Sequence, residues 1–387
     1  MTIGIIGSGS MGTGIAQVAA TAGNQVFIYD NNPSAIARAQ TQLKKILARL
    51  AEKGRISAEE KESILNRIHF IESYFEFKQA DLVIEAIIED LEIKKNVFAQ
   101  VEEIVRPTCI LATNTSSLSV SAIASACESP HRVLGIHFFN PAPLMKLVEI
   151  VPSIQTDLSI VRQAKTIIEH WGKQVVIAKD TPGFIVNRVA RPFYGEALRI
   201  LEEGMADVPT IDWAMTEIGG FRMGPFTLMD YIGNDVNYTV TETVFKSFFY
   251  DSRYKPSFTQ KRLAEAGYLG RKSGRGFYDY SEGAQNPEPL KDPELGKQIF
   301  WRILVMLINE AADALYWNIA SRDDIDLAMT TGVNYPKGLL QWADETGIQK
   351  CVKAMDQLHQ AYLEDRYRCS PLLRKMARDG KKFYESN

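Results

Sequence analysis

The 387-residue sequence predicts an α/β fold, a doubly wound sheet, followed by two all-α helical domains. Short strand-like runs alternate with helical stretches in the first part of the chain, which is the pattern of parallel strands joined by crossover helices. A glycine-rich turn joins the first strand to the first helix, and a helical segment occurs twice in the remainder. The expected domains are residues 1–181, 182–284 and 292–387.

The composition is that of an ordinary globular protein and narrows its partners. Hydrophobic residues make up 45% and charged residues 24% of the chain, and the net charge is −3, so nothing indicates binding to nucleic acid or to a membrane surface. The longest apolar run, "IFWRILVMLI" from Ile299, is too short to span a bilayer and contains Arg302. A strand-like run begins at Thr2, which leaves no room for a targeting segment.

The four cysteines lie far apart and form no C-x-x-C pair: Cys109, Cys127, Cys351 and Cys369. This spacing favours a reducing compartment and argues against a disulfide framework or a zinc site. We therefore expect a cytoplasmic protein without a metal centre.

The glycine-rich turn has the pattern G-x-G-x-x-G and lies between the strand "TIGIIG" and a helix. Gly7 makes the tight turn, Gly9 lets the backbone approach a pyrophosphate, and Gly12 lets helix and strand pack closely. The first N–H groups of the helix, around Ser10 and Met11, are expected to bind the phosphates. The context predicts a Rossmann-type dinucleotide site, and a glycine turn that binds no nucleotide is the alternative.

A carboxylate at the end of the second strand, "QVFIYD", indicates which dinucleotide is bound. Asp30 can accept hydrogen bonds from the adenosine ribose diol and repels a 2′-phosphate. Asn31 and Asn32 follow it, with no arginine to bind that phosphate. The sequence therefore favours NAD over NADP.

The segment from Ala35 to about Phe77 is long for a crossover and predicts two helices that break near "EKGRIS". Between Arg38 and Arg55 it carries six basic residues and one acid. Lys45, Arg49 and Lys53 recur every four residues and share one helical face. This face is either a site for a second polyanion or a solvated amphipathic surface.

Further strands are expected along the rest of the first domain, at "DLVIEA", "CILATN", "RVLGIHFF", "KLVEIV" and "QVVIA". The third and fourth of these form a hairpin around "NPAPLM". With the turn centred near Pro143, His137 lies opposite Glu149. A carboxylate beside an imidazole holds its tautomer and raises its proton affinity, which suits a general base. A purely structural pair is the alternative.

Two other segments carry polar groups that suit a substrate. "ATNTSSLS" places Ser116 in a hydroxyl cluster after a strand, where a helix cap is the alternative role. "DTPGFIVNR" predicts a helix with Thr181 as N-cap and Pro182 as its first residue. Asn187 would lie in the first turns of that helix, either functional or merely exposed.

Six segments, in this order, are similar to the (3S)-3-hydroxyacyl-CoA dehydrogenase family: "GSGSMGTGIA", "NTSSL", "HFFNPAPLMKLVEIV", "DTPGFIVNRV", "MGPFTLMDYIG" and "GRKSGRGFYDY". The resemblance covers residues 1 to about 280. It implies an NAD-binding Rossmann domain followed by a helical domain. It also implies reversible oxidation of (3S)-3-hydroxyacyl-CoA to 3-oxoacyl-CoA in fatty-acid metabolism, such as β-oxidation.

The resemblance assigns roles to residues that match the family's motifs. His137 would be the general acid/base and Glu149 its orienting carboxylate. Ser116 and Asn187 would hydrogen-bond the 3-oxygen and the thioester region of the substrate. Asp30 would bind the adenosine ribose. Other expected cofactor contacts, besides the glycine turn, are Glu89, Lys94, Ser116, Asn140 and Lys272.

Contacts with coenzyme A are implied by fewer positions. Lys53 matches a position that contacts CoA in the family, and Ser116 and Asn187 would touch the acyl part. This chain has Ile46 where some relatives carry a CoA-binding serine. The details of CoA binding are therefore the least determined part of the expected site.

The helical segment is repeated at an offset of 114 residues, with 14 identities in 49 positions that include Arg188/Arg302 and Glu196/Glu310. The second copy has Trp301 where the first has Asn187, and "KKFY" where the first has "GRKSGRGFY". Since it keeps scaffold positions and loses polar ones, we expect an intramolecular pseudo-dimer with one active site per chain. Assembly into a homo-oligomer stays open.

Two other functions fit the same residues less well. One is a dehydrogenase of a free hydroxy acid or sugar acid, because relatives of the L-gulonate dehydrogenase type share many of these motifs. The basic crossover face favours CoA over this alternative. The other is a non-catalytic NAD-binding protein, which the full set of Ser116, His137, Glu149 and Asn187 disfavours.

Overall fold

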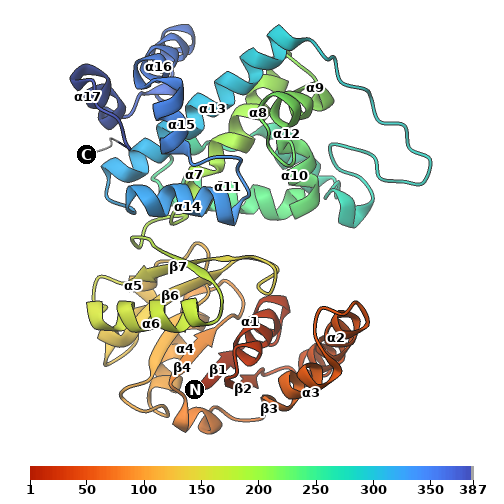
Figure 1. Cartoon of the computed structure of the whole chain (residues 1–387), viewed down its shortest axis with the longest axis vertical. Coiled ribbons are helices and arrows are strands. Elements are labelled where there is room, and N and C mark those ends of the chain that lie inside the picture. Colours follow the sequence, from red (N-terminus) through yellow and green to blue (C-terminus); the bar gives the residue numbers. More distant parts are fainter. Residues whose placement is uncertain (385–387) are drawn as a thin grey trace. The chain divides into compact units, whose positions relative to one another are not determined.

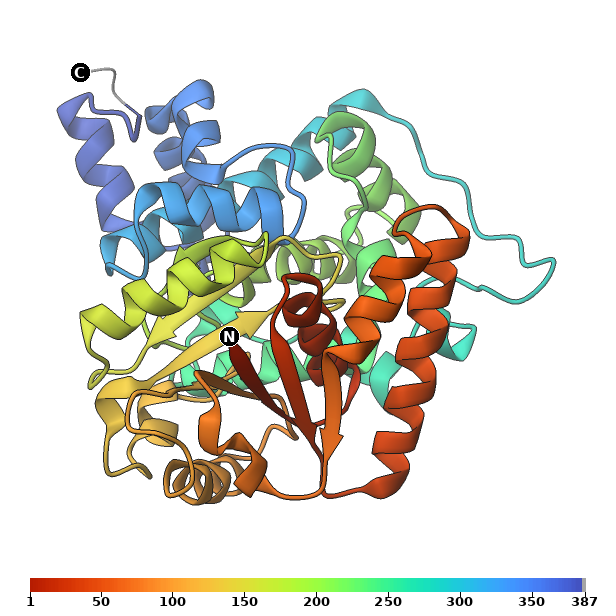
Figure 2. The same cartoon turned by 60° about the horizontal axis from the view of Figure 1, so that its bottom comes forward.

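The chain divides into two units, Met1–Phe184 and Ile185–Asn387, in the computed structural model, which describes residues 1–384. The first unit contains one eight-stranded sheet of order β3-β2-β1-β4-β5-β6-β7-β8 (Figure 1, Figure 2). All neighbouring strands are parallel except β6 and β7. The strands are β1 (Thr2–Ile6), β2 (Gln25–Tyr29), β3 (Ile68–Ile71), β4 (Leu82–Glu85), β5 (Ile110–Thr113), β6 (Val133–Phe138), β7 (Leu147–Pro152) and β8 (Gln174–Ile177).

Helices cover both faces of this sheet, so the predicted doubly wound fold is confirmed. The first layer consists of α1 (Ser10–Thr21), α2 (Pro33–Glu52), α3 (Ala58–Asn66) and α6 (Leu158–His170). The second layer consists of η1 (Tyr74–Gln79), α4 (Leu91–Glu102) and α5 (Val120–Ala124), and the short turn η2 (Pro130–Arg132) precedes β6. Central strands such as β4 are buried on both faces, which is why they read as continuous apolar runs in the sequence.

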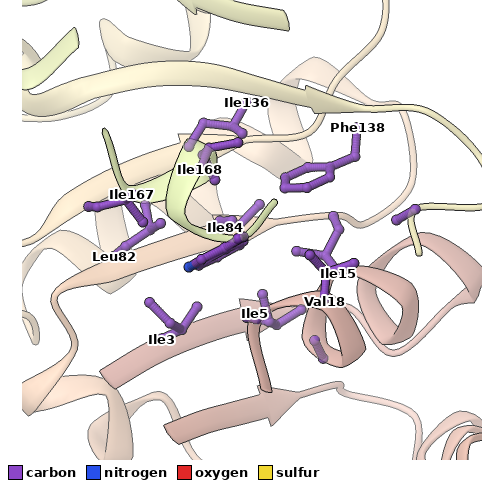
Figure 3. Packing of buried hydrophobic residues seen from close by; sticks show 14 of the residues in the cluster. Ile3, Ile5, Ile15, Val18, Leu82, Ile84, Ile136, Phe138, Ile167 and Ile168 are labelled. Carbon is purple, nitrogen blue, oxygen red and sulfur yellow. The ribbon is translucent and has the colours of Figure 1, made fainter. Parts of the chain in front are cut away.

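The core of the first layer is a close-packed set of branched side chains (Figure 3). Ile3 and Ile5 of β1 lie with Ile15 of α1, and all three are fully buried. Burying such side chains contributes about 1.5–3 kcal/mol each. This packing fixes α1, and therefore the glycine turn that precedes it, against the sheet.

The structure differs from the sequence analysis in two places. The short strand β3 was not predicted; it has four residues, and its side chain at His69 is exposed. The helix expected from Pro182 does not begin there, and α7 covers only Val186–Val189. Gly183 and Phe184 have φ values of 74° and 46°, and residues in the left-handed region cannot continue a right-handed helix. Thr181 is therefore not an N-cap.

The second unit consists of helices and their connections as far as residue 384, with two isolated β-bridges at Arg275, and contains the two copies of the repeat (Figure 1). The first copy consists of α7, α8 (Arg191–Glu202), α9 (Val208–Trp213), the π-helical turn η3 (Ala214–Ile218), α10 (Pro225–Ile232), α11 (Asn234–Ser247), η4 (Ser252–Tyr254), α12 (Phe258–Glu265) and η5 (Arg271–Ser273). The second consists of α13 (Pro293–Tyr316), α14 (Arg322–Gly332), α15 (Leu339–Thr346), α16 (Ile348–Tyr362), η6 (Asp365–Tyr367) and α17 (Pro371–Asp379). An extended segment connects them and includes residues 285–291, which lie between the two expected helical domains.

The copies share hydrogen bonds as well as sequence. Asp212 in the first copy and Asp326 in the second each accept two backbone N–H bonds from the start of the following helix, at 2.8 to 2.9 Å. These bonds satisfy N–H groups that a helix leaves unpaired at its amino end. The conserved spacing of the aspartates in the repeat therefore has a structural cause.

Helices α8 and α13 pack against each other and join the two copies. Nε of Arg188 donates to Oε1 of Glu310 at 2.7 Å, and Nε of Arg302 donates to Oε1 of Glu196 at 2.6 Å. Both glutamates are fully buried. The two ion pairs are equivalent under the 114-residue offset, so each copy supplies one arginine and one glutamate to the other.

Candidate active site

The hairpin of β6 and β7 pairs His137 with Glu149, as its sequence predicted. Nδ1 of His137 lies 2.7 Å from Oε2 of Glu149. The histidine is 6% exposed and the glutamate is fully buried. A carboxylate at Nδ1 holds the proton on that nitrogen, so that the lone pair of Nε2 is available as a base.

Aromatic side chains orient the imidazole. The ring centroid of His137 lies 4.5 Å from that of Phe139 and 5.9 Å from that of Phe184. Within residues 1–384, no hydrogen bond engages Nε2. The ring is therefore held from one side by a carboxylate and by apolar contacts, with one nitrogen left for a reaction.

The loop that carries Ser116 is organised by Glu89. Oε1 of Glu89 accepts hydrogen bonds from the Thr115 hydroxyl at 2.5 Å, the Ser116 N–H at 3.1 Å and the Ser117 hydroxyl at 3.1 Å. Among the described residues, the Ser116 hydroxyl has no hydrogen-bond partner. The loop thus presents one unengaged hydroxyl after strand β5.

Glu89 is in turn tied to a buried ion pair. Nζ of Lys94 lies 3.3 Å from Oε2 of Glu89 and 2.5 Å from Oε1 of Glu85, and Lys94 and Glu85 are each 1% exposed. Burial raises the pKa of Glu89, but the charge of Lys94 and the hydrogen bonds from the serine loop outweigh this effect and lower it. The ammonium group of Lys94 is engaged by the carboxylates of Glu85 and Glu89. Direct contact between Lys94 and the cofactor stays a prediction.

Glu85 and Thr115 are site-supporting residues that the sequence did not reveal. Glu85 also accepts hydrogen bonds from the Thr113 hydroxyl at 2.8 Å and the Ile87 N–H at 2.7 Å. The available signal was a carboxylate at the end of the strand "DLVIEA", where ligands bind in open α/β sheets. Without the fold, that carboxylate could not be distinguished from a solvated one.

The glycine turn fits a dinucleotide. Gly7 has φ of +102°, and a Cβ at Gly12 would lie 1.9 Å from the Gly7 carbonyl oxygen. Gly9 has ordinary φ, and a Cβ there would meet nothing within 4 Å. Nothing inside the protein requires glycine at that position, so the space beside it suits a bound pyrophosphate. No side chain caps α1, which leaves N–H groups near Ser10 and Met11 for phosphates.

Asp30 joins the glycine turn to the end of β2. One of its oxygens, Oδ2, accepts from the Ser8 N–H at 2.7 Å and the Ser8 hydroxyl at 2.8 Å, and Oδ1 accepts from the Asn32 N–H at 2.9 Å. The carboxylate is half-buried. Its binding to the ribose stays a prediction, and its second role is to hold the turn in place.

The basic face of α2 is exposed and unpaired. Lys45, Arg49 and Lys53 are exposed, and Lys53 follows directly as the C-cap of the helix. Within residues 1–384, these three side chains form no ion pair. Ile46, the departure from the family pattern, is 38% exposed on the same helix.

Of the remaining predicted site residues, one belongs to the first unit and two belong to the second. Asn140 is exposed in the loop between β6 and β7. Asn187, on α7, is half-buried, and its side chain has no hydrogen-bond partner among the described residues. Lys272 lies in η5, and its Nζ pairs with Asp235 at 2.6 Å. Their contacts with substrate or cofactor stay predictions.

Nearly the whole chain is similar to known proteins. The 3-hydroxyacyl-CoA dehydrogenase NAD binding domain matches residues 2–181, and the C-terminal domain of that family matches residues 183–280 and 299–386. A 3-hydroxyadipyl-CoA dehydrogenase of Escherichia coli (strain K12) is 39% identical, over 97% of each chain. A probable 3-hydroxybutyryl-CoA dehydrogenase of Bacillus subtilis (strain 168) is 43% identical, over 72% of this chain and 96% of its own.

The structural comparison agrees. A crystal structure of 3-hydroxybutyryl-CoA dehydrogenase from Escherichia coli K12 superposes with a TM-score of 0.92 at 38% identity, and covers 97% of this chain and 98% of its own. No helix within residues 1–384 is long and apolar enough to cross a bilayer. The relatives named here are dehydrogenases of 3-hydroxyacyl-CoA thioesters. The chain belongs to the 3-hydroxyacyl-CoA dehydrogenase family and is an oxidoreductase that uses NAD to oxidise 3-hydroxyacyl-CoA.

Proposed function

We propose that His137 and Glu149 form the acid–base dyad of this enzyme. The observation that carries the proposal is the 2.7 Å contact between Nδ1 of a nearly buried His137 and a fully buried Glu149. Nε2 of His137 removes the proton from the 3-hydroxyl group of the substrate, and the charge of Glu149 stabilises the resulting imidazolium. NAD, when bound, accepts the hydride from C3 of the substrate.

Two neutral groups act on the substrate oxygens in this proposal. The hydroxyl of Ser116 and the amide of Asn187 donate hydrogen bonds where charge changes, at the 3-oxygen and the thioester. The support is that neither side chain is engaged by another described residue. Residues of the glycine turn, with Asp30, Glu89, Asn140 and Lys272, hold the dinucleotide, and Lys94 supports Glu89.

Coenzyme A is assigned to the basic face of α2. Exposed, unpaired cations such as Lys45, Arg49 and Lys53 suit the phosphates of this substrate.

The cytoplasmic location is also part of the proposal, and it rests on four cysteines that are all buried and unpaired.

We also propose that the second helical copy is a built-in partner for the first, so that the unit is an intramolecular pseudo-dimer. The reciprocal pairs of Arg188 with Glu310 and of Arg302 with Glu196 support this view. Residues 182–284 and 292–387 remain the proposed limits of the copies. Trp301 replaces Asn187, so the second copy has no substrate site of its own.

The dyad is tested by His137→Ala and Glu149→Gln. Turnover of a 3-oxoacyl-CoA with NADH, followed by absorbance, should fall by roughly 10²–10⁴-fold in His137→Ala. Glu149→Gln should be similarly damaging, because it removes the charge that stabilises the imidazolium. The dissociation constant of NADH should hardly change in either variant.

A matched control is His69→Ala, since His69 is an exposed histidine on β3 that contacts Gln25. It should retain full turnover. Near-normal turnover in either dyad variant would sink the assignment of the dyad without affecting the family.

A further inference from the structure

The second unit buries one arginine that has no acidic partner. Six arginines of the chain are at least nine-tenths buried: Arg132, Arg188, Arg191, Arg253, Arg302 and Arg366. Five of them lie within 4 Å of a glutamate or aspartate oxygen. Arg191, at 7% exposed, has no such partner among the described residues. A guanidinium cannot shed its charge, so burying it unpaired is costly.

Among the described residues, the surroundings of Arg191 supply one hydroxyl acceptor and a ring face but no carboxylate. Its Nη1 donates to the Thr241 hydroxyl at 3.0 Å, and its guanidinium carbon lies 4.9 Å from the ring centroid of Tyr194. Burial lowers the pKa of Arg191, and the electrostatic interactions with Tyr194 and Tyr335 act weakly in the opposite direction. The site is thus a buried cation without a counter-ion.

Two buried donor groups at this site are unused. Nε of Arg191 and the hydroxyl of Tyr335 have no hydrogen-bond partner within residues 1–384. Tyr335 is 5% exposed and comes from the second helical copy. Its ring centroid lies 5.6 Å from that of Phe193 in the first copy. Unpaired buried donors are rare in folded proteins, and here an acceptor anion would satisfy both.

The second copy shows that the fold does not need this polar cluster. At the 114-residue offset, Val305 stands for Arg191 and Ile308 for Tyr194, and both are fully buried. On the next helices, Cys351 and Met355 stand for Asn237 and Thr241 and are also fully buried. In the second copy, apolar side chains therefore fill the positions that are polar in the first copy, and the corresponding helices still pack together. At these four positions polar residues occur only in the copy that carries Asn187, and Tyr335 reaches them from the other copy. This points to a ligand and not to the scaffold.

We propose that Arg191, together with Tyr335, binds a carboxylate at the far end of the acyl chain. Preferred substrates are then CoA thioesters of 3-hydroxydicarboxylic acids. This inference rests on the proposed role of Asn187, which lies one helical turn before Arg191, roughly 6 Å along the axis. A short methylene chain covers a distance of this order between the thioester region and a terminal carboxylate.

A carboxylate matches the available atoms better than a neutral chain end does. It accepts hydrogen bonds on two oxygens, which suits Nε of Arg191 together with the hydroxyl of Tyr335. It also neutralises the buried charge, whereas a terminal methyl group would leave it unpaired. The cost of burying the arginine is thereby compensated only when the substrate is bound.

The test uses the full-length enzyme and two 3-oxoacyl-CoA substrates of equal chain length. One ends in a carboxylate, as in 3-oxoadipyl-CoA, and the other in a methyl group, as in 3-oxohexanoyl-CoA. Wild type should prefer the carboxylate substrate at least about 30-fold in kcat/KM. Arg191→Gln should reduce this preference roughly 30-fold or more, because a buried charged contact is lost. The loss should lie mainly in KM, since the contact is remote from the reacting carbon.

Two further variants separate binding from folding. Tyr335→Phe should reduce the preference roughly tenfold, through loss of one hydrogen bond to a charged group. Arg199→Gln is the matched control on the same helix; Arg199 pairs with Glu364 at 2.6 Å, so the preference should not change. The Tm of Arg191→Gln should equal or exceed that of wild type, because no ion pair is broken.

The outcomes are distinct. Equal kcat/KM for both substrates in wild type, or an unchanged preference in Arg191→Gln, would overturn the inference while the dehydrogenase mechanism stands. A large fall in the Tm of Arg191→Gln, with the preference kept in Tyr335→Phe, would show that the cluster is structural. If wild type reduces neither substrate, the proposed function itself fails.

Discussion

The two helical copies of the second unit have the same scaffold and different interiors. Both use an aspartate to hold the start of a helix, Asp212 in one and Asp326 in the other. Both place a glutamate of the long central helix against an arginine of the other copy. Near Asn187, however, the first copy buries polar side chains where the second buries apolar ones.

This difference separates two kinds of position in one chain, those that the two copies share and those that only the first copy has. Residues that the copies share bind each other or cap helices, so their identity follows from the fold. Residues that only the first copy has, such as Asn187 and Arg191, have no structural substitute in the second. A duplicated domain therefore provides its own control for distinguishing scaffold from function, and four predictions test this distinction.

Removing the second copy should have the largest effect. A chain ending at Gln285 leaves Glu196 without Arg302 and exposes the apolar face of α8. We expect this fragment to aggregate or self-associate, as light scattering combined with turnover would reveal. Co-expression with residues 286–387 should restore a well-behaved enzyme. A monomeric fragment with full activity would show that the second copy is a tethered accessory.

Breaking one ion pair between the copies should cost less than losing the whole copy. Glu310 accepts from Nε of Arg188 at 2.7 Å, the Tyr254 hydroxyl at 2.6 Å and Nη1 of Arg253 at 3.1 Å. Glu310→Gln should lower the free energy of unfolding by about 3–5 kcal/mol in urea titrations. Glu196→Gln should cost less, because Oε2 of Glu196 has no hydrogen bond within the described residues.

The same pair predicts a pH dependence. Burial raises the pKa of Glu310, but the charges of Arg188 and Arg253 outweigh burial and lower it. A lowered folded-state pKa gives stability that is present above the unfolded value, about 4.3, and lost as pH falls below it. Glu310→Gln should flatten this acid loss. Glu294→Gln, at an exposed pair with Lys297 (2.8 Å), should change stability by less than about 0.5 kcal/mol. Equal effects of the buried and exposed variants would contradict the comparison.

Exchanging the residues that distinguish the copies should have the smallest effect on folding and a selective one on turnover. Asn187→Trp, which introduces the residue of the second copy, should lower kcat roughly 10²–10³-fold through loss of a hydrogen-bond donor. Trp301→Asn should leave turnover per folded molecule unchanged. If the two variants behave alike, Asn187 has no role that the second copy lacks.

The sequence by itself determined the features that depend on neighbours in the chain. The glycine turn from Gly7 to Gly12, the alternation of strands and helices, and the pairing of His137 with Glu149 across a short loop all follow from local spacing. The 114-residue offset also identified Arg188, Arg302, Glu196 and Glu310 as scaffold before their contacts were known. Each of these follows from short-range geometry or from simple repetition.

Only the tertiary structure decided which polar groups are buried and what they meet. The four-residue β3 and the break at Phe184 depend on packing and on backbone angles that composition does not specify. Arg191 looks like any helical arginine in the sequence. Its lack of an acidic partner, and the approach of Tyr335 from the other copy, appear only after distant segments come together. The cost of a buried charge depends on every side chain around it, and the order of residues along the chain does not show which ones those are.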